Sequence, residues 1–187
     1  FYLDNDTNKC AQMHNDKHCI KMILEYCQLL STAHRVLDGN EQDVKSKTGR
    51  NVKRWLLNDS QLESTLYSAT HINHPSAVWV RQSKENYNWL ANLLVNLCAE
   101  YTYRYGKIHK CQEIGLVSLL LLSLPKNIQD KPFTEPTPAM PDDVKIIGDS
   151  LKSYRNYYNL NKTHLASWKG KINSRNEPEW FNANIRI

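Results

Sequence analysis

The clearest pattern in the chain lies at residues 14–35, where apolar positions recur at helical spacing with little interruption. A narrow polar line runs along this segment at steps of three and four residues, which places its members on one helix face. The polar line consists of His18, Lys21, Glu25, Gln28, Thr32 and Arg35. A helix that is apolar on its other sides is normally buried, so we expect the polar line to face a cleft or a partner. The alternative interpretation is a helix with a thin edge in water.

Similar spacing predicts three further main helices. One covers residues 83–105, and Gly106 follows it at the position where glycine typically ends a helix. A very apolar one covers about 110–124 and stops before a proline. The last begins at Asp142 and Asp143, whose side chains can cap its first turn.

Two segments lack helical periodicity. Residues 38–53 are polar and contain glycine, so we expect a loop there. Residues 125–141 hold five prolines and predict an extended strap over the surface. The tail at 169–187 is basic and aromatic without a period. No convincing strand alternation is found, so the sequence predicts a single all-α domain of about four main helices.

Composition limits the possible classes of protein. The 187 residues carry a formal charge of +5, which is compatible with a polyanionic partner without requiring one. The five cysteines form no CxxC pair, so we expect reduced core residues of an intracellular protein. No apolar run reaches 18 residues, so we expect neither a membrane span nor a signal peptide. The chain begins at Phe1 without a methionine, and we expect a different native start.

A metal site is one candidate chemistry. His14 and His18 are four residues apart, and Glu25 lies two turns further along the same helix. His71 and His74 could complete the site from a second segment. However, the chain has neither HExxH nor the paired Glu-x-x-His motifs of di-metal bundles. A metal-dependent helical hydrolase is therefore kept only as an alternative, and no cofactor is expected.

Lys21 and Glu25 suggest a different chemistry. Lysine before glutamate at this spacing is the weaker order for stabilising a helix, so helix support does not fully explain the pair. A partly desolvated lysine can act as an amine nucleophile. A nearby carboxylate can move protons or stabilise a cationic, oxocarbenium-like sugar. This combination suits cleavage of an N-glycosidic bond.

A family resemblance supports that interpretation. Residues 16–30, DKHCIKMILEYCQLL, resemble the first conserved helix of the pyrimidine-dimer DNA glycosylases, the endonuclease V-like proteins of phages and bacteria. The positions that match the family pattern are Asp16, Lys17, His18, Lys21 and Glu25. Residues 73–106 resemble the family's His-Pro segment and the amphipathic helix after it. The two blocks cover 49 residues. The chain is also similar to uncharacterised proteins of tailed phages.

The resemblance implies a DNA repair enzyme that flips a nucleotide and cleaves the base–sugar bond through an imine. Glu25 matches the family's essential glutamate, and we expect Glu25, Lys21 and His18 to be catalytic. The phage enzyme uses its N-terminal amine as nucleophile, a role that does not carry over to Phe1 because we expect a different native start. The true N-terminus or Lys21 would form the imine here, or this relative has lost the lyase step. The family places arginines beside its glutamate, whereas this chain has Leu24 and Gln28, which puts specificity for pyrimidine dimers in doubt.

DNA is accordingly the expected partner. The expected DNA-binding residues are His14, Arg35, His74, Arg81, Arg104 and Lys107. Lys53, Arg54 and the tail residues Lys169, Lys171 and Arg175 are further candidates. The expected location is intracellular, in the host cytoplasm if a phage encodes the protein. The main alternative is a phage structural or accessory protein without catalysis, in which the polar line packs against a virion partner or a second subunit.

Overall fold

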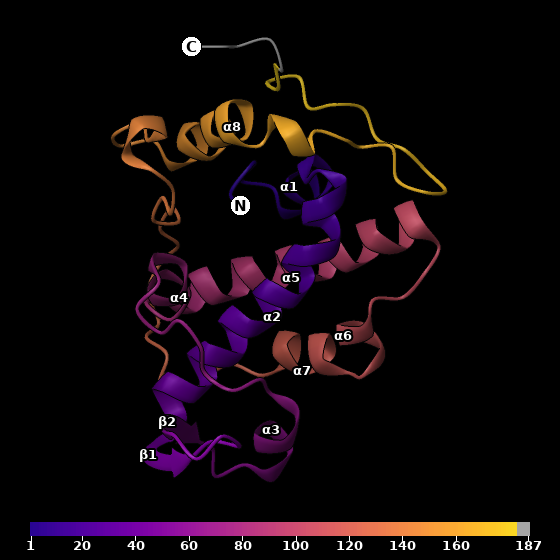
Figure 1. The fold of residues 1–187 in the computed structure, drawn as a ribbon. Coiled ribbons are helices and arrows are strands. Elements are labelled where there is room, and N and C mark those ends of the chain that lie inside the picture. The colour runs from indigo at the N-terminus through magenta and orange to yellow at the C-terminus, as the bar shows by residue number, and fades with distance from the viewer. Residues whose placement is uncertain (183–187) are drawn as a thin grey trace.

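The computed structural model describes residues 1–182. Within that range the chain forms eight α-helices, two short 3-10 helices and one antiparallel pair of strands (Figure 1). The α-helices are α1 (Thr7–Met13), α2 (Asp16–Asp38), α3 (Ser60–Thr65), α4 (Pro75–Val80), α5 (Lys84–Tyr105), α6 (Lys110–Glu113), α7 (Leu116–Leu122) and α8 (Ser150–Asn161). No helix in this range has the length and apolar character needed to cross a membrane.

The two long helices, α2 and α5, pack against each other and contribute much of the core (Figure 1). The side chain of Asn15 caps α2 by accepting the backbone N–H of His18, and Ser83 caps α5 in the same way. Gly106 ends α5 in the left-handed conformation with φ of 65°. The helix predicted within residues 14–35 and the helix predicted at 83–105 are therefore confirmed as α2 and α5, whereas α1 was not predicted.

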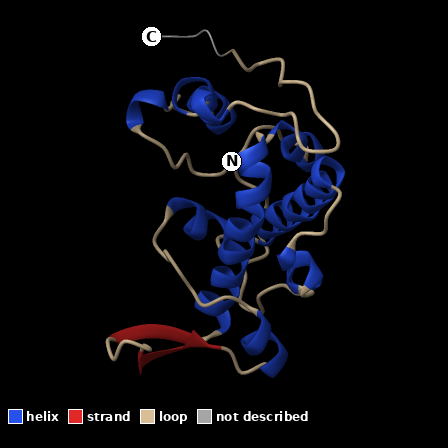
Figure 2. Ribbon diagram, turned by 45° about the vertical axis from the view of Figure 1, so that its right-hand side comes forward, coloured by secondary structure: helices blue, strands red, loops and turns tan. Residues whose placement is uncertain are grey.

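The all-α prediction is wrong, because residues within the expected loop form a β-hairpin (Figure 2). β1 (Asn40–Lys45) pairs antiparallel with β2 (Asn51–Leu56), and Gly49 takes φ of 78° in the turn between them. Most side chains of β1 are exposed, so neither face needs a regular apolar row. The alternation that normally reveals a strand is absent for that reason.

Two other helix predictions need correction. The apolar segment at 110–124 is two short helices, α6 and α7, separated at Gly115, whose φ is 80°. Asp142 and Asp143 begin only a 3-10 turn, Asp142–Val144. The last long helix, α8, begins later, after Asp149, whose side chain accepts the backbone N–H of Lys152. A second 3-10 turn, Thr163–Leu165, follows it.

The proline-rich strap at 125–141 is extended, as predicted. Asn86 on α5 holds the strap by accepting the backbone N–H of Thr134 at 2.9 Å. The predicted tail lies partly outside the described residues, at 183–187. Its described part packs on the body, where Arg175 pairs with Glu100 at 2.9 Å. Trp168, just before the tail, is buried. These contacts are structural and take Arg175 out of the group of candidate DNA contacts.

Candidate functional site

The middle of the polar line on α2 opens onto a cavity of about 370 Å³. Its walls come from α2, from the segment leading into α4, from the strap and from α8. The lining residues are Phe1, Met22, Glu25, Tyr26, Gln28, Leu29, Thr70, His71, His74, Ser76, Ala139, Tyr154 and Tyr157. A cavity of this size with a few polar groups on a largely apolar wall is typical of a small-molecule site.

Glu25 is the carboxylate of the cavity, and its side chain is 38% exposed. Lys21 lies one turn earlier and places its Nζ 2.9 Å from Glu25 Oε1. Lys21 is 71% exposed and is outside the cavity lining. The predicted pairing of these two residues is therefore found, with the carboxylate in the cavity and the ammonium on its outer side.

Two histidines lie across the cavity from α2. His74 caps α4, and its Nδ1 accepts the backbone N–H of Ser76 at 3.2 Å, so in the neutral ring Nε2 carries the proton. His71 Nδ1 lies 2.8 Å from Thr70 Oγ1. His71 also has a φ of 47°, the only positive value of a non-glycine residue recorded between residues 1 and 182. Backbone strain of this kind often occurs at functional sites.

Aromatic rings form another wall. The rings of Phe1 and Tyr157 are nearly parallel, with an interplanar angle of 17° and centroids 6.1 Å apart. The ammonium of Lys162 lies over the ring of Tyr157 at 4.6 Å from its centroid. The cavity thus combines flat apolar surfaces with a carboxylate, two imidazoles and the amide of Gln28.

A buried hydrogen-bond chain supports the cavity floor. The nitrogen of Phe1 donates to Tyr26 Oη at 2.8 Å, and Tyr26 Oη lies 2.8 Å from His14 Nε2. His14 Nδ1 lies 2.7 Å from the carbonyl oxygen of Cys10 and must donate to it. His14 Nε2 is then the acceptor, and Tyr26 donates to it.

Burial is the largest cause of the shifted pKa values of His14 and Tyr26. It lowers the pKa of His14 well below the usual value and raises that of Tyr26 well above it. His14 is therefore a neutral structural residue with both ring nitrogens bonded, which excludes the predicted role as a DNA contact.

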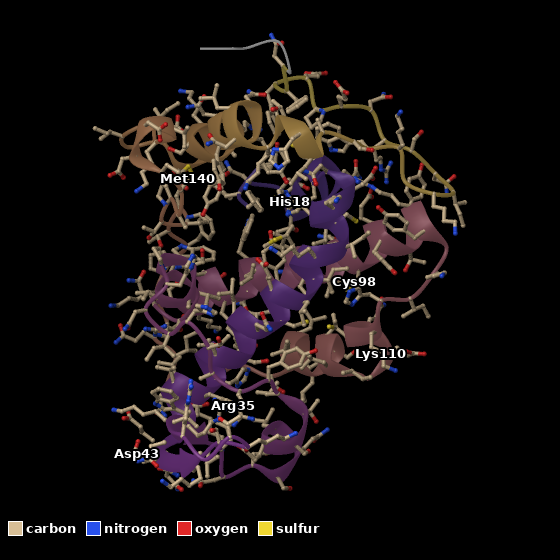
Figure 3. All side chains as sticks on the ribbon, in the orientation of Figure 1. His18, Arg35, Asp43, Cys98, Lys110 and Met140 are labelled. Atoms are coloured by element: carbon tan, nitrogen blue, oxygen red, sulfur yellow. The ribbon has the colours of Figure 1, made fainter. Side chains whose placement is uncertain are left out.

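His18 lies behind the cavity wall, beneath α8 (Figure 3). Its Nδ1 accepts from Tyr158 Oη at 2.6 Å, and its ring stacks on Phe1 with centroids 4.2 Å apart. Burial, and then the nearby amine of Phe1, lower the pKa of His18 to about 3. His18 is outside the cavity lining and supports Phe1 from behind, so its predicted catalytic role is not supported.

Two of the predicted DNA contacts are internal arginines. Arg35, near the hairpin in Figure 3, donates to the carbonyl oxygens of Trp55, Tyr67 and Leu66 and pairs with Glu63 at 2.7 Å. Arg104 is fully buried. It donates to the backbone oxygens of Gln12 and His14 and pairs with Asp16 and Glu100. Both guanidinium groups direct their donors to acceptors inside the protein, so neither is free to bind a phosphate.

The other predicted contacts lie at the surface. Arg81 is partly buried and donates to the carbonyl oxygens of Ile72 and Ala77, which fixes the segment that carries His74. Lys107 is exposed beyond the end of α5 and outside the cavity lining. Of the six predicted DNA contacts, only His74 lines the cavity.

The alternative metal set is not brought together. His14 and His18 bind separate partners inside the fold, whereas Glu25, His71 and His74 line the cavity. Across residues 1–182, no three His, Cys, Asp or Glu side chains are arranged to hold a metal ion. All five cysteines are buried and unpaired.

Sequence reasoning missed several cavity residues. Tyr157 and Tyr154 come from α8, more than 120 residues after Glu25, and Ala139 comes from the strap. No local pattern joins these segments to α2. Gln28 could have been found, because it belongs to the same polar line as Glu25.

Comparison of the chain with protein-family models, with curated proteins and with solved structures gives no match. The interpretation of the site therefore depends on its geometry.

Proposed function

We propose that the cavity receives a nucleobase flipped out of DNA and that the protein cleaves its N-glycosidic bond. The observation that carries this proposal is the position of Glu25, a paired carboxylate on the wall of an aromatic-lined cavity. Enzymes that act on a base take it out of the helix stack into such a pocket. The rings of Phe1, Tyr154 and Tyr157 provide apolar surface for a base, and Gln28 offers both a donor and an acceptor to its edge.

In the hydrolytic form of the reaction, Glu25 takes a proton from a water molecule whose oxygen attacks the sugar C1′. The bond between C1′ and the base nitrogen breaks, and its electron pair leaves with the base. Cationic charge develops on the sugar, and the carboxylate of Glu25 stabilises that charge. The proton that Glu25 has taken passes to the leaving base through water, which restores the carboxylate, and the Nε2–H of His74 can donate a hydrogen bond to that base.

In the imine form, a neutral amine attacks C1′ in place of water, and the base leaves with the electron pair of the broken bond. One amine proton passes to the base and the other to the ring oxygen as the sugar opens to a Schiff base. Lys21 Nζ lies at the outer side of the cavity, bonded to Glu25. Lys21 and the native N-terminal amine are the candidates for the nucleophile.

The test of this proposal is base release from oligonucleotides that contain a thymine dimer, a uracil or an unpaired thymine. We expect release from at least one substrate and a loss of about 100-fold or more in Glu25→Gln. Glu113→Gln is a matched control, because Glu113 forms a similar exposed pair with Lys110 at 3.0 Å. Equal rates in wild type and Glu25→Gln would contradict the assignment, and no release from any substrate would favour a binding protein without catalysis.

Borohydride trapping on the same substrates identifies the amine. An adduct that disappears in Lys21→Ala but persists in the matched variant Lys110→Ala assigns the imine to Lys21. An adduct that peptide mapping places on the first residue of a version with its native N-terminus restored assigns it to the N-terminal amine. Base release without an adduct would exclude the imine form and leave the hydrolytic one.

A further inference from the structure

We propose that the β1–β2 hairpin contacts the phosphate backbone of duplex DNA. This inference rests on the proposed function, because it assumes that the substrate of the cavity is part of a nucleic acid. It concerns a different part of the molecule from the cavity, and it replaces the buried arginines as the DNA-binding surface.

The hairpin holds much of the chain's positive charge. Residues 40–56 contain five basic side chains, Lys45, Lys47, Arg50, Lys53 and Arg54, and two acidic ones, Glu41 and Asp43. Their formal net charge of +3 is more than half of the +5 of the whole chain. A segment of 17 residues therefore concentrates the basic character on one projection of the molecule (Figure 2).

Most of these basic side chains have no acidic partner in the fold. Lys53 pairs with Glu41 at 2.5 Å across the strands. Within residues 1–182, no ion pair joins the other four basic side chains of the hairpin to an acid. Arg35 and Arg104 show the opposite arrangement, with every donor directed inward. The basic groups at the hairpin are thus available for an external anion.

The tip is an ordered turn. Ser46 donates its backbone N–H to the carbonyl oxygen of Arg50 at 2.8 Å, and Gly49 donates to the carbonyl oxygen of Ser46 at 2.9 Å. The side chain of Ser46 also accepts the backbone N–H of Arg50 at 3.1 Å. Lys47 and Arg50 are therefore held on a defined turn with exposed side chains.

The root of the hairpin is fixed to the body. An isolated two-stranded hairpin is only marginally stable in water. Here Arg35 donates to the carbonyl oxygen of Trp55 at 2.9 Å. Gly39, between α2 and β1, lies so close to Trp55 that an added Cβ would be 3.0 Å from its backbone. The ribbon thus projects rigidly while leaving most of its surface in solvent.

The shape and spacing of this projection fit duplex DNA. The major groove admits a two-stranded β-ribbon, and phosphate contacts need basic groups at its sides. Glu25 and Gly39 are 14 residues apart along α2, which corresponds to about 21 Å. Gly39 is at the root of the hairpin, so the root lies about six base-pair steps from Glu25, and a duplex longer than this can reach both the hairpin and the cavity.

The test is the affinity for an undamaged 30-base-pair duplex, measured by fluorescence anisotropy over a series of salt concentrations. We expect the double variant Lys47→Gln/Arg50→Gln to bind at least about tenfold more weakly at low salt. We also expect its salt slope to fall by about 2, one phosphate for each lost charge. The matched control is Lys126→Gln/Lys131→Gln, which removes the same charge from exposed positions outside the hairpin.

The outcomes separate this inference from the proposed function. If both double variants lost the same affinity for the duplex, the loss would follow from net charge alone. That result would overturn the hairpin contact. Unchanged binding in the hairpin variant, or no binding by the wild type, would also overturn it. In each case, the proposed role of Glu25 is still tested by comparing the rates at which wild type and Glu25→Gln release a base from short single strands. Loss of hairpin binding with retained release from single strands would support both assignments.

Discussion

At the scale of the residue, the position of a basic side chain decides what it can bind. Arg104 and Lys107 lie three positions apart in the sequence, yet the first is fully buried and the second is exposed. Arg35 and Arg104, which were predicted to contact phosphates, instead donate hydrogen bonds to backbone carbonyl groups of the protein. The sequence shows the charge of these residues, but it does not show that backbone carbonyl groups from distant segments surround them.

Arg104→Ala should strongly destabilise the protein, by about 3–5 kcal/mol. The substitution removes one of the two arginine partners of Glu100, which is 4% exposed, and it leaves the backbone oxygens of Gln12 and His14 without a donor. Urea denaturation measures the free energy of unfolding. Lys107→Ala is the control and should change it by less than about 0.5 kcal/mol. Similar values for the two variants would contradict the structural role of Arg104.

The buried histidines should make stability depend on pH. The folded pKa of His18 is about 3, and those of His14 and His34 are also lowered by burial. The unfolded chain takes up protons near pH 6.5, so the stabilisation is complete above that pH and is lost as the pH falls. For His18, the loss continues down to about pH 3.

Between pH 7 and pH 5, His18→Gln should lose about 2 kcal/mol less stability than the wild type does. Urea midpoints at the two pH values measure this difference. Gln42→Ala, an exposed position without a titratable group, serves as the control and should leave the pH dependence of the wild type unchanged. An unchanged pH dependence in His18→Gln would show that His18 is not held neutral in the folded state.

At the scale of the element, predictability follows from burial. α2 and α5 bury a continuous face, so their apolar spacing and caps define them. The hairpin buries no complete face. Tertiary contacts stabilise its strands instead, such as the hydrogen bond from Arg35 to the carbonyl oxygen of Trp55. The break between α6 and α7 at Gly115 could not be predicted from the sequence pattern, because apolar residues continue on both sides of it.

Arg35→Ala should loosen the hairpin root and α3 together. It removes donors to Trp55, Tyr67 and Leu66 and leaves Glu63 without its arginine. Hydrogen exchange followed by mass spectrometry should show faster exchange over residues 51–67 than in the wild type. Lys17→Ala, an exposed position on the same helix, is the control. Unchanged exchange in Arg35→Ala would contradict the role of Arg35 as an anchor.

At the scale of the whole molecule, the cavity joins segments that are far apart in the sequence. α2 contributes Glu25 and Gln28, the segment before α4 contributes His71 and His74, and α8 contributes Tyr157. The polar line and the His-Pro segment could be predicted from sequence, because each is a local pattern. The aromatic wall could not, because α8 reaches the cavity only through the extended strap.

The central claim is that a nucleobase enters this cavity, and the histidine ring signals in NMR test it most directly. Glu25→Gln, which should bind without turnover, would be titrated with a duplex that holds one unpaired thymine. We predict shifts of the His71 and His74 signals, with His34 and His109 unchanged because neither lines the cavity. Binding that leaves His71 and His74 unshifted would contradict the account.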